Sequence, residues 1–200
     1  MRNVVLTSVV PLMLAGCSGL LDSTDEAVPE SALTFIRVAA DAPPLAANQV
    51  SFWIVRGRET EVEIRYQNGS YNGKCLLFRV PANAPLRYPD GRLFQPGDSA
   101  RVTIRVVDPQ RFIFHFDPAG LKFDPAHPAQ LEVRHRWADA DFNGDGVRDS
   151  RDERIERNFG FWRQERPGEP WTRISTSRLH DVLEARATVT GFTIYALASD

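Results

Sequence analysis

A twelve-residue acidic stretch, residues 141–152, has the residue types and spacing with the clearest chemical potential in this chain. Oxygen-bearing side chains stand at its positions 1, 3, 5, 9 and 12, which are Asp141, Asn143, Asp145, Asp149 and Asp152. Calcium is a hard cation that binds six to eight oxygen atoms, and a loop with this spacing can wrap one ion. Gly146 permits the sharp turn at position 6, and the carbonyl oxygen of Val147 would supply a backbone ligand. The spacing therefore predicts a calcium site.

This stretch resembles the calcium loops of EF-hand and dockerin proteins, which share its D-x-N-x-D-G pattern. An alternative register that begins at Asp139 would put Ser150 at position 12, where a serine cannot supply the bidentate carboxylate that closes such a site. The register that begins at Asp141 puts Asp152 there and is favoured, so Asp139 lies just outside the ligand set. Dockerins carry two such loops between helices, whereas this chain has one, so the resemblance does not imply partner recognition of the dockerin kind.

The other interpretation of this stretch is a solvated acidic turn without a metal ion. Charge disfavours it, because residues 139–152 hold five aspartates, and carboxylates that crowd together repel one another. A bound cation relieves that repulsion. Magnesium suits the loop less well than calcium, since it keeps several of its waters and uses fewer protein ligands. The expected calcium affinity is weak, with a dissociation constant on the order of 10⁻⁴ to 10⁻³ M.

The amino terminus has the features of a secretion signal. Arg2 provides the positive charge, and the apolar run over residues 4–14 is too short to span a bilayer comfortably. The run ends in Leu14-Ala15-Gly16-Cys17, which resembles the lipobox of bacterial lipoproteins. That resemblance implies removal of residues 1–16 and a stable membrane anchor of acyl chains on Cys17. Ser18, rather than aspartate, follows the cysteine, which by the family's sorting pattern favours the outer membrane. The alternative is an ordinary signal peptide with a chance cysteine.

Residues 17–32 are small, polar and acidic, and they predict a flexible tether between the anchor and the folded domain. A random coil of this length reaches roughly 20 Å, so the domain is expected to stay near the membrane surface. Cys75 is the only thiol outside the lipobox, so no intramolecular disulfide is expected once Cys17 is acylated. Cys75 lies in an apolar run and is predicted to be a buried structural thiol.

Composition and hydrophobic periodicity predict one all-β domain over residues 33–200. The chain of 200 residues is 42% hydrophobic and 25% charged, and its net charge of −2 gives no nucleic-acid signal. Residues 61–67 and 100–107 alternate apolar and polar side chains, as half-buried strands do. Further strand signals lie at residues 33–40, 50–55, 74–80, 111–117, 131–137, 184–190 and 192–198. Many short strands predict an antiparallel β-sandwich, with the acidic loop of residues 139–152 inserted and one helical turn at residues 152–157.

Three segments resemble the β-sandwich domain shared by zona-occludens proteins, netrin receptors and ankyrins. They are residues 78–84, residues 116–131 with the pattern F-D-P-A-G-L-K-F and P-A-Q-L, and Trp171 with the ending G-F-T-I-Y-A at residues 191–196. Bacterial cell-surface lipoproteins with such a sandwich are similar in outline. Some members of the family cut themselves before a serine in this ending. Here Gly191 replaces the family's histidine and Thr193 the serine, and no base lies beside Thr193 in the sequence, so self-cleavage is not expected.

The chain lacks the short motifs of the common hydrolases, metalloproteases and phosphate-binding enzymes, and its four histidines are scattered. The sequence therefore favours a non-catalytic structural or interaction module, anchored to the membrane through Cys17, with a protein or polysaccharide of the envelope as its partner. A carbohydrate-binding or adhesive module is the alternative. Its basis is the four tryptophans, which are expected in the core more often than on a sugar-binding surface.

Overall fold

The computed structural model describes residues 27–200, which form an antiparallel β-sandwich with one α-helix. The largest sheet has the strand order β1-β12-β11-β15-β8-β7-β3, and β2 also pairs with β15. Its strands are β1 (Ala27–Val28), β2 (Thr34–Phe35), β3 (Gln49–Val55), β7 (Ser99–Asp108), β8 (Ile113–Asp117), β11 (Gly160–Gln164), β12 (Trp171–Arg173) and β15 (Ile194–Ser199). The predicted signal peptide, Cys17 and the first part of the tether lie outside the described residues.

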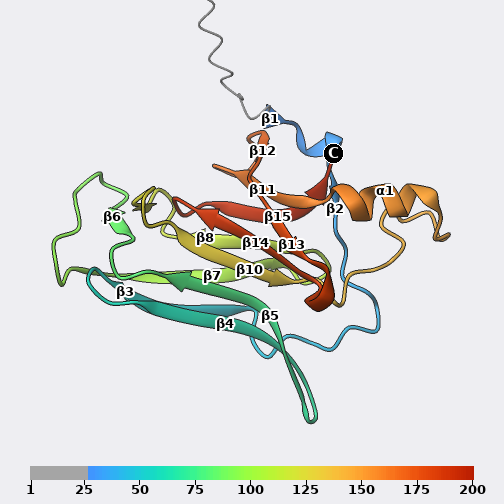
Figure 1. Cartoon of the computed structure of the whole chain (residues 1–200), viewed down its shortest axis with the longest axis horizontal. Helices are drawn as coiled ribbons and strands as arrows, with labels where there is room; N and C mark the ends of the chain where they lie inside the picture. Colours follow the sequence, from blue (N-terminus) through green and yellow to red (C-terminus); the bar gives the residue numbers. More distant parts are fainter. Residues whose placement is uncertain (1–26) are drawn as a thin grey trace, which may run out of the picture.

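The second sheet has the order β13-β14-β10-β5-β4, and a small pair of strands, β6 and β9, lies beside the two main layers. These strands are β4 (Thr60–Asn68), β5 (Tyr71–Val80), β6 (Pro85–Arg87), β9 (Lys122–Phe123), β10 (Ala129–Arg134), β13 (Ser177–Leu179) and β14 (Glu184–Val189). Figure 1 shows the tip of the β4–β5 hairpin projecting from one side of the molecule, with β1 and β12 on the opposite side.

Side-chain alternation explains how the two main sheets meet. Along β7, Val102, Ile104 and Val106 are buried, whereas Arg101 and Arg105 are exposed. A strand with this period presents one apolar face, and two such faces packed together exclude water from a single core. The predicted antiparallel β-sandwich is confirmed.

Four phenylalanines at the centre of this core come from both sheets and from the turns between strands. The ring of Phe78 on β5 lies 5.1 Å from that of Phe116 on β8 and 5.8 Å from that of Phe192. Phe123 on β9 packs edge-on against Phe192 at 5.3 Å. Aromatic pairs at such distances add to the burial energy, so this cluster joins the layers of the sandwich.

The start of the described chain differs from the prediction. Residues 27–32 were assigned to a flexible tether, but they form β1 and the short 3₁₀ helix η1 (Glu30–Ala32). Val28, Leu33 and Phe35 pack on the outer face of the large sheet, against a buried apolar cluster that contains the rings of Trp162 and Trp171. The folded domain therefore includes residue 27 and those that follow it. Contacts with β11 and β12, far away in the sequence, hold this short segment in place.

Candidate metal centre

The acidic loop leaves the second sheet after β10 and runs into the only α-helix of residues 27–200, α1 (Ser150–Asn158). Asp149 is the N-cap of α1: its carboxylate accepts a hydrogen bond from the backbone N–H of Arg151 at 2.7 Å. Asp152 completes a reciprocal capping box with Asp149. The helix is longer than the single turn predicted at residues 152–157, because the cap starts it at Ser150.

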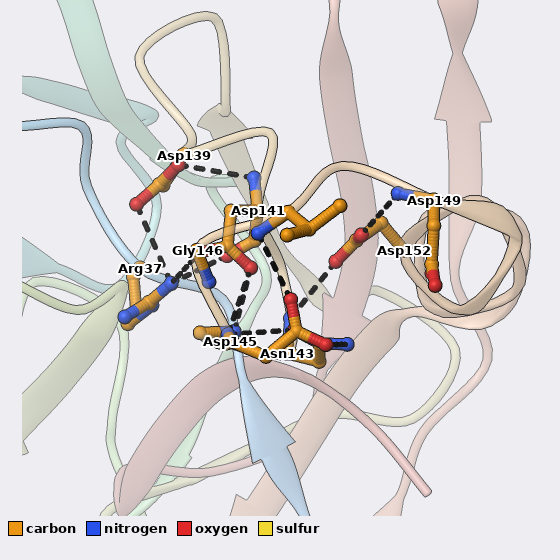
Figure 2. Close-up of polar contacts among 10 residues, drawn as sticks. Arg37, Asp139, Asp141, Asn143, Asp145, Gly146, Asp149 and Asp152 are labelled. Carbon is orange, nitrogen blue, oxygen red and sulfur yellow. Dashed lines mark hydrogen bonds and ion pairs between the residues drawn. The ribbon is translucent and has the colours of Figure 1, made fainter.

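Asp141, at position 1 of the loop, organises the turn that follows it. Its Oδ1 accepts hydrogen bonds from the N–H groups of Gly144 at 2.8 Å and Asp145 at 3.2 Å, and its Oδ2 accepts one from Gly146 at 2.9 Å. Gly146 has a φ of +86°, a conformation that favours glycine, as predicted for position 6. Figure 2 shows the loop wrapped around the Asp141 carboxylate.

Asn143 and Asp145 continue the turn with the same kind of local bond. The side-chain oxygen of Asn143 accepts from the N–H of Asp145, and Oδ1 of Asp145 accepts from the N–H of Val147, both at 2.9 Å. The amide nitrogen of Asn143 also donates to Oδ2 of Asp145 at 3.0 Å. Such bonds let a short polar chain reverse direction without strand or helix pairing.

Asp152, at position 12, links both ends of the loop. Its carboxylate is almost fully buried, with Oδ2 accepting from the N–H of Asp149 at 2.8 Å and Oδ1 from that of Asn143 at 3.0 Å. These two backbone hydrogen bonds hold the pKa of Asp152 below its ordinary value. The residue therefore stays ionised and ties the start of α1 back to the middle of the loop.

An arginine that the sequence analysis did not identify lies against the loop. Arg37, which follows β2, donates to the backbone carbonyl of Asp141, and its Nη2 lies 3.4 Å from Oδ2 of Asp139 and 3.6 Å from Oδ2 of Asp141. Asp139 also accepts from the N–H of Asp141 at 3.0 Å. Figure 2 shows Arg37 and Asp139 at the edge of the loop. Arg37 lies more than one hundred positions away in sequence, and no local signal marks it.

Two aromatic rings fasten the loop to the core. Phe142, at position 2, is 6% exposed, and its ring lies 6.3 Å from that of Phe159, which follows α1. Phe159 also packs edge-on against His135 at 4.9 Å, and Ile155 of α1 reaches the same core. Phe142 and Phe159 therefore hold the polar turn against the core from both of its ends.

The donor atoms of this loop are oxygens, the ligand type that calcium prefers. Asp141, Asn143, Asp145 and Asp152 offer hard oxygen ligands, and each of their side-chain oxygens except Oδ1 of Asp141 accepts no more than one hydrogen bond from a backbone N–H group of the loop. Within residues 27–200, however, no group of three or more His, Cys, Asp or Glu side chains converges closely enough to hold a metal ion as it stands. Asp149 is engaged as a helix cap, and the side chain of Val147 is 61% exposed. The side chains here bind the loop's own N–H groups.

Comparisons of the chain with protein-family models, with curated proteins and with solved structures found no match. The resemblances to calcium loops, lipoboxes and the zona-occludens type of sandwich therefore stay predictions. Among residues 27–200, no helix is both long and apolar enough to cross a membrane. Cys75 is buried and unpaired, as the sequence predicts.

Proposed function

We propose that this chain is a lipid-anchored protein of the bacterial cell envelope whose β-sandwich is a non-catalytic structural or interaction module stabilised by one calcium ion. The observation that carries the calcium proposal is the loop of residues 141–152, in which five oxygen-bearing side chains and one backbone carbonyl follow calcium-loop spacing. The loop is already turned by its own hydrogen bonds, and Phe142 and Phe159 fix it to the core.

The ligands would be the side chains of Asp141, Asn143, Asp145, Asp149 and Asp152 with the carbonyl oxygen of Val147. Calcium would supply positive charge among carboxylates that otherwise repel one another. Because Asp152 belongs to α1 and Asp141 to the preceding turn, the ion would join these two elements. Its role here is structural, since it would hold the connection between β10 and β11 in one conformation.

Calorimetric titration of the chelator-treated protein tests the metal proposal. Calcium should bind with a dissociation constant on the order of 10⁻⁴ to 10⁻³ M, and magnesium should bind more weakly. Asp141→Asn removes a ligand charge but keeps an oxygen that can accept the loop's N–H groups, so this variant should lose the heat of calcium binding and keep its fold. Absence of heat at millimolar calcium would rule out the site.

The membrane proposal rests on the lipobox-like Leu14-Ala15-Gly16-Cys17 and is tested separately. Mass spectrometry of the protein from its native membrane should find cleavage before Cys17 and acyl chains on that residue. Cys17→Ala should release the protein to the soluble fraction or leave the signal peptide uncleaved. A cleaved but unmodified Cys17 would contradict the anchor.

The carbohydrate-binding alternative has one structural observation in its favour. Trp53 on β3 is 55% exposed on the outer face of the large sheet, directly across from Arg101 on β7. Trp162 and Trp171 are buried, and Trp137 donates its indole N–H to the hydroxyl of Tyr71. A single exposed ring is a small platform, so this function is the second candidate. Trp53→Ala in affinity electrophoresis against envelope polysaccharides tests it.

A further inference from the structure

A cleft of about 480 Å³ lies where the carboxyl end of α1 meets β12 and the segment between β12 and β13. Three arginines line it: Arg157 from the last turn of α1, Arg173 from β12 and Arg178 from β13. None of the residues that line this cleft, all of them in the described part of the chain, carries a carboxylate. A volume of this size admits a small ligand, and the lining favours a negatively charged one.

Two of these arginines are fixed by the end of the helix. Arg178 donates to the carbonyl oxygens of Glu156 and Arg157, and Arg173 donates to that of Asn158. The guanidinium carbon of Arg178 lies 4.8 Å from the centre of the Phe159 ring. Because carbonyls at a helix carboxyl end carry partial negative charge, these contacts hold both guanidinium groups in place.

The hydrogen bonds to the end of the helix do not use all the N–H donors of these arginines. A guanidinium has five N–H donors. Arg178 uses two of its nitrogens for carbonyl oxygens, and Arg173 uses one for Asn158 and one for Asp200, at 3.2 Å. Arg157 caps nothing; it lies 3.6 Å from Glu153 in an ion pair that is mostly exposed and therefore weak. The residues that line the cleft therefore include N–H donors that these contacts do not use and a third positive charge.

Burial is the largest influence on the pKa of Arg178 and lowers it, the charge of Glu156 raises it, and the charge of Arg173 lowers it to a smaller extent. Arg178 is therefore a partly buried cation whose charge an anion in the cleft would help to balance. Arginine is well suited to phosphate, because its planar fork donates two parallel hydrogen bonds to phosphate oxygens.

The cleft also lies next to the point where the chain enters the domain. Ala27 on β1 pairs with Thr172 on β12, the residue before Arg173. Cys17 lies ten positions before Ala27, and ten residues span at most about 36 Å when extended and typically about 18 Å as a coil. Figure 1 shows β1, β12 and α1 away from the β4–β5 hairpin. An acyl anchor on Cys17 would therefore hold this side of the molecule near the lipid headgroups.

We propose that this cleft binds a phosphate group and that the group belongs to an anionic lipid headgroup of the membrane that holds the anchor. Arg157, Arg173 and Arg178 supply the charge, and the hydroxyl of Ser175 in the lining supplies a further donor. The lipid source, though not the phosphate site itself, rests on the proposed anchor at Cys17. The anchor and the cleft would then fix the orientation of the sandwich on the membrane by two contacts.

Calorimetric titration of the full chain in a neutral detergent tests the proposal with three water-soluble probes: inorganic phosphate, glycerophosphoglycerol (the headgroup of phosphatidylglycerol without its acyl chains) and uncharged glycerol. The two phosphate compounds should bind and glycerol should not. Arg157→Gln, which leaves the helix cap intact, should weaken binding several-fold, and adding Arg173→Gln should weaken it at least about tenfold. Arg101→Gln, an exposed arginine on β7, is the matched control and should leave affinity unchanged.

The outcomes of these titrations test the phosphate site and the lipid source separately. No binding of either phosphate compound, or equal binding by the Arg157→Gln variant, would overturn the site. Binding of inorganic phosphate without glycerophosphoglycerol would assign the cleft to free phosphate and overturn the lipid source. Because these titrations do not depend on acylation, a failure of the anchor appears only in the mass of Cys17, whereas a failure of the cleft appears only in the titrations.

Discussion

Two clusters of carboxylates in this molecule are stabilised in different ways. The first is the acidic loop of residues 139–152. The second, which we call the charge network, lies on the five-stranded sheet around the buried Glu184 and consists of Lys74, Glu132, Arg134, Glu184 and Arg186. In the network, Glu184 is 1% exposed and accepts from Arg186 at 2.7 Å, and Lys74 lies 2.8 Å from Glu132. In the loop, most acceptors are filled by backbone N–H groups.

The difference shows which cluster needs an external cation. Strand pairing places Glu132 opposite Arg186 and Arg134 opposite Glu184, so the network contains its own positive charges. The backbone N–H groups that bind the loop's side-chain oxygens carry no net charge. Arg37 approaches only the edge of the loop, and Arg151 reaches Asp145 at 3.6 Å in a largely exposed ion pair. The network is complete as folded, whereas the loop keeps an excess of negative charge that calcium would neutralise.

The largest expected effect comes from breaking the network. Glu184→Gln removes the buried negative charge, but Lys74 keeps Glu132 as a partner and Arg134 and Arg186 are 41% and 49% exposed. The free energy of unfolding should therefore fall by about 3 kcal/mol, the lower end of the cost of breaking a buried pair. Chemical denaturation measures this loss. Glu61→Gln, which breaks an exposed pair with Arg79, is the control and should cost less than about 1 kcal/mol. Equal losses in the two variants would show that the network is not a special source of stability.

The region around the loop and the charge network should lose stability in different pH ranges. Burial and, to a smaller extent, the charges of Arg178 and His180 lower the pKa of His135 to about 4, against the raising influence of Glu184. His135 packs beside the loop anchor Phe159. The unfolded chain then binds more protons than the folded one between the ordinary pKa of about 6.5 and about 4, so stability should fall as pH falls through this range, by up to about 3 kcal/mol. His135→Gln should flatten this part of the profile of unfolding free energy against pH.

The network should respond only at lower pH. Burial alone would raise the pKa of Glu184, but hydrogen bonds from Arg186, Lys74 and Arg134 outweigh it and hold that pKa at about 2. Its stabilising contribution is therefore present above about pH 4.5 and is lost as pH falls from there through about 2. A single acid transition shared by wild type and both the His135→Gln and Glu184→Gln variants would contradict this separation.

The smallest expected effect concerns Arg37, the arginine beside Asp139 and Asp141 at the edge of the loop. Arg37→Gln breaks partly exposed ion pairs, so it should lower the stability of the calcium-free protein by less than about 1 kcal/mol. It also removes a positive charge close to Asp141, so calcium should bind more tightly. Calorimetric titration measures the change in affinity, and weaker calcium binding by this variant would contradict the placement of the ion near Asp141.

The sequence was most informative where a local pattern determines the structure. Alternation predicted β7, and the spacing of aspartates and glycine predicted a turn with Gly146 at positive φ. The pair Asp149 and Asp152 is also a local capping signal, and it is consistent with a helix that begins at Ser150.

The sequence was least informative where tertiary contacts decide. The strand β11 is largely buried on both faces and therefore shows no alternation, and β12 has only three residues. Val28 belongs to the folded domain because it packs against the side chains of Trp162 and Trp171. The residues next to Val28 in the sequence give no sign of this contact. The same holds for Arg37, whose partners at the loop lie in a distant segment.

The most direct measurement of the central claim is thermal unfolding of the chelator-treated full chain with and without calcium. Calcium that binds the folded loop and not the unfolded chain should stabilise the protein by about 2.7 kcal/mol at one hundred times its dissociation constant, and the melting temperature should rise accordingly. Asp141→Asn should abolish this gain, whereas Asp90→Asn, at an exposed turn remote in sequence from the loop, should retain it. A wild-type melting temperature that does not change with calcium, or a gain that survives Asp141→Asn, would contradict the account.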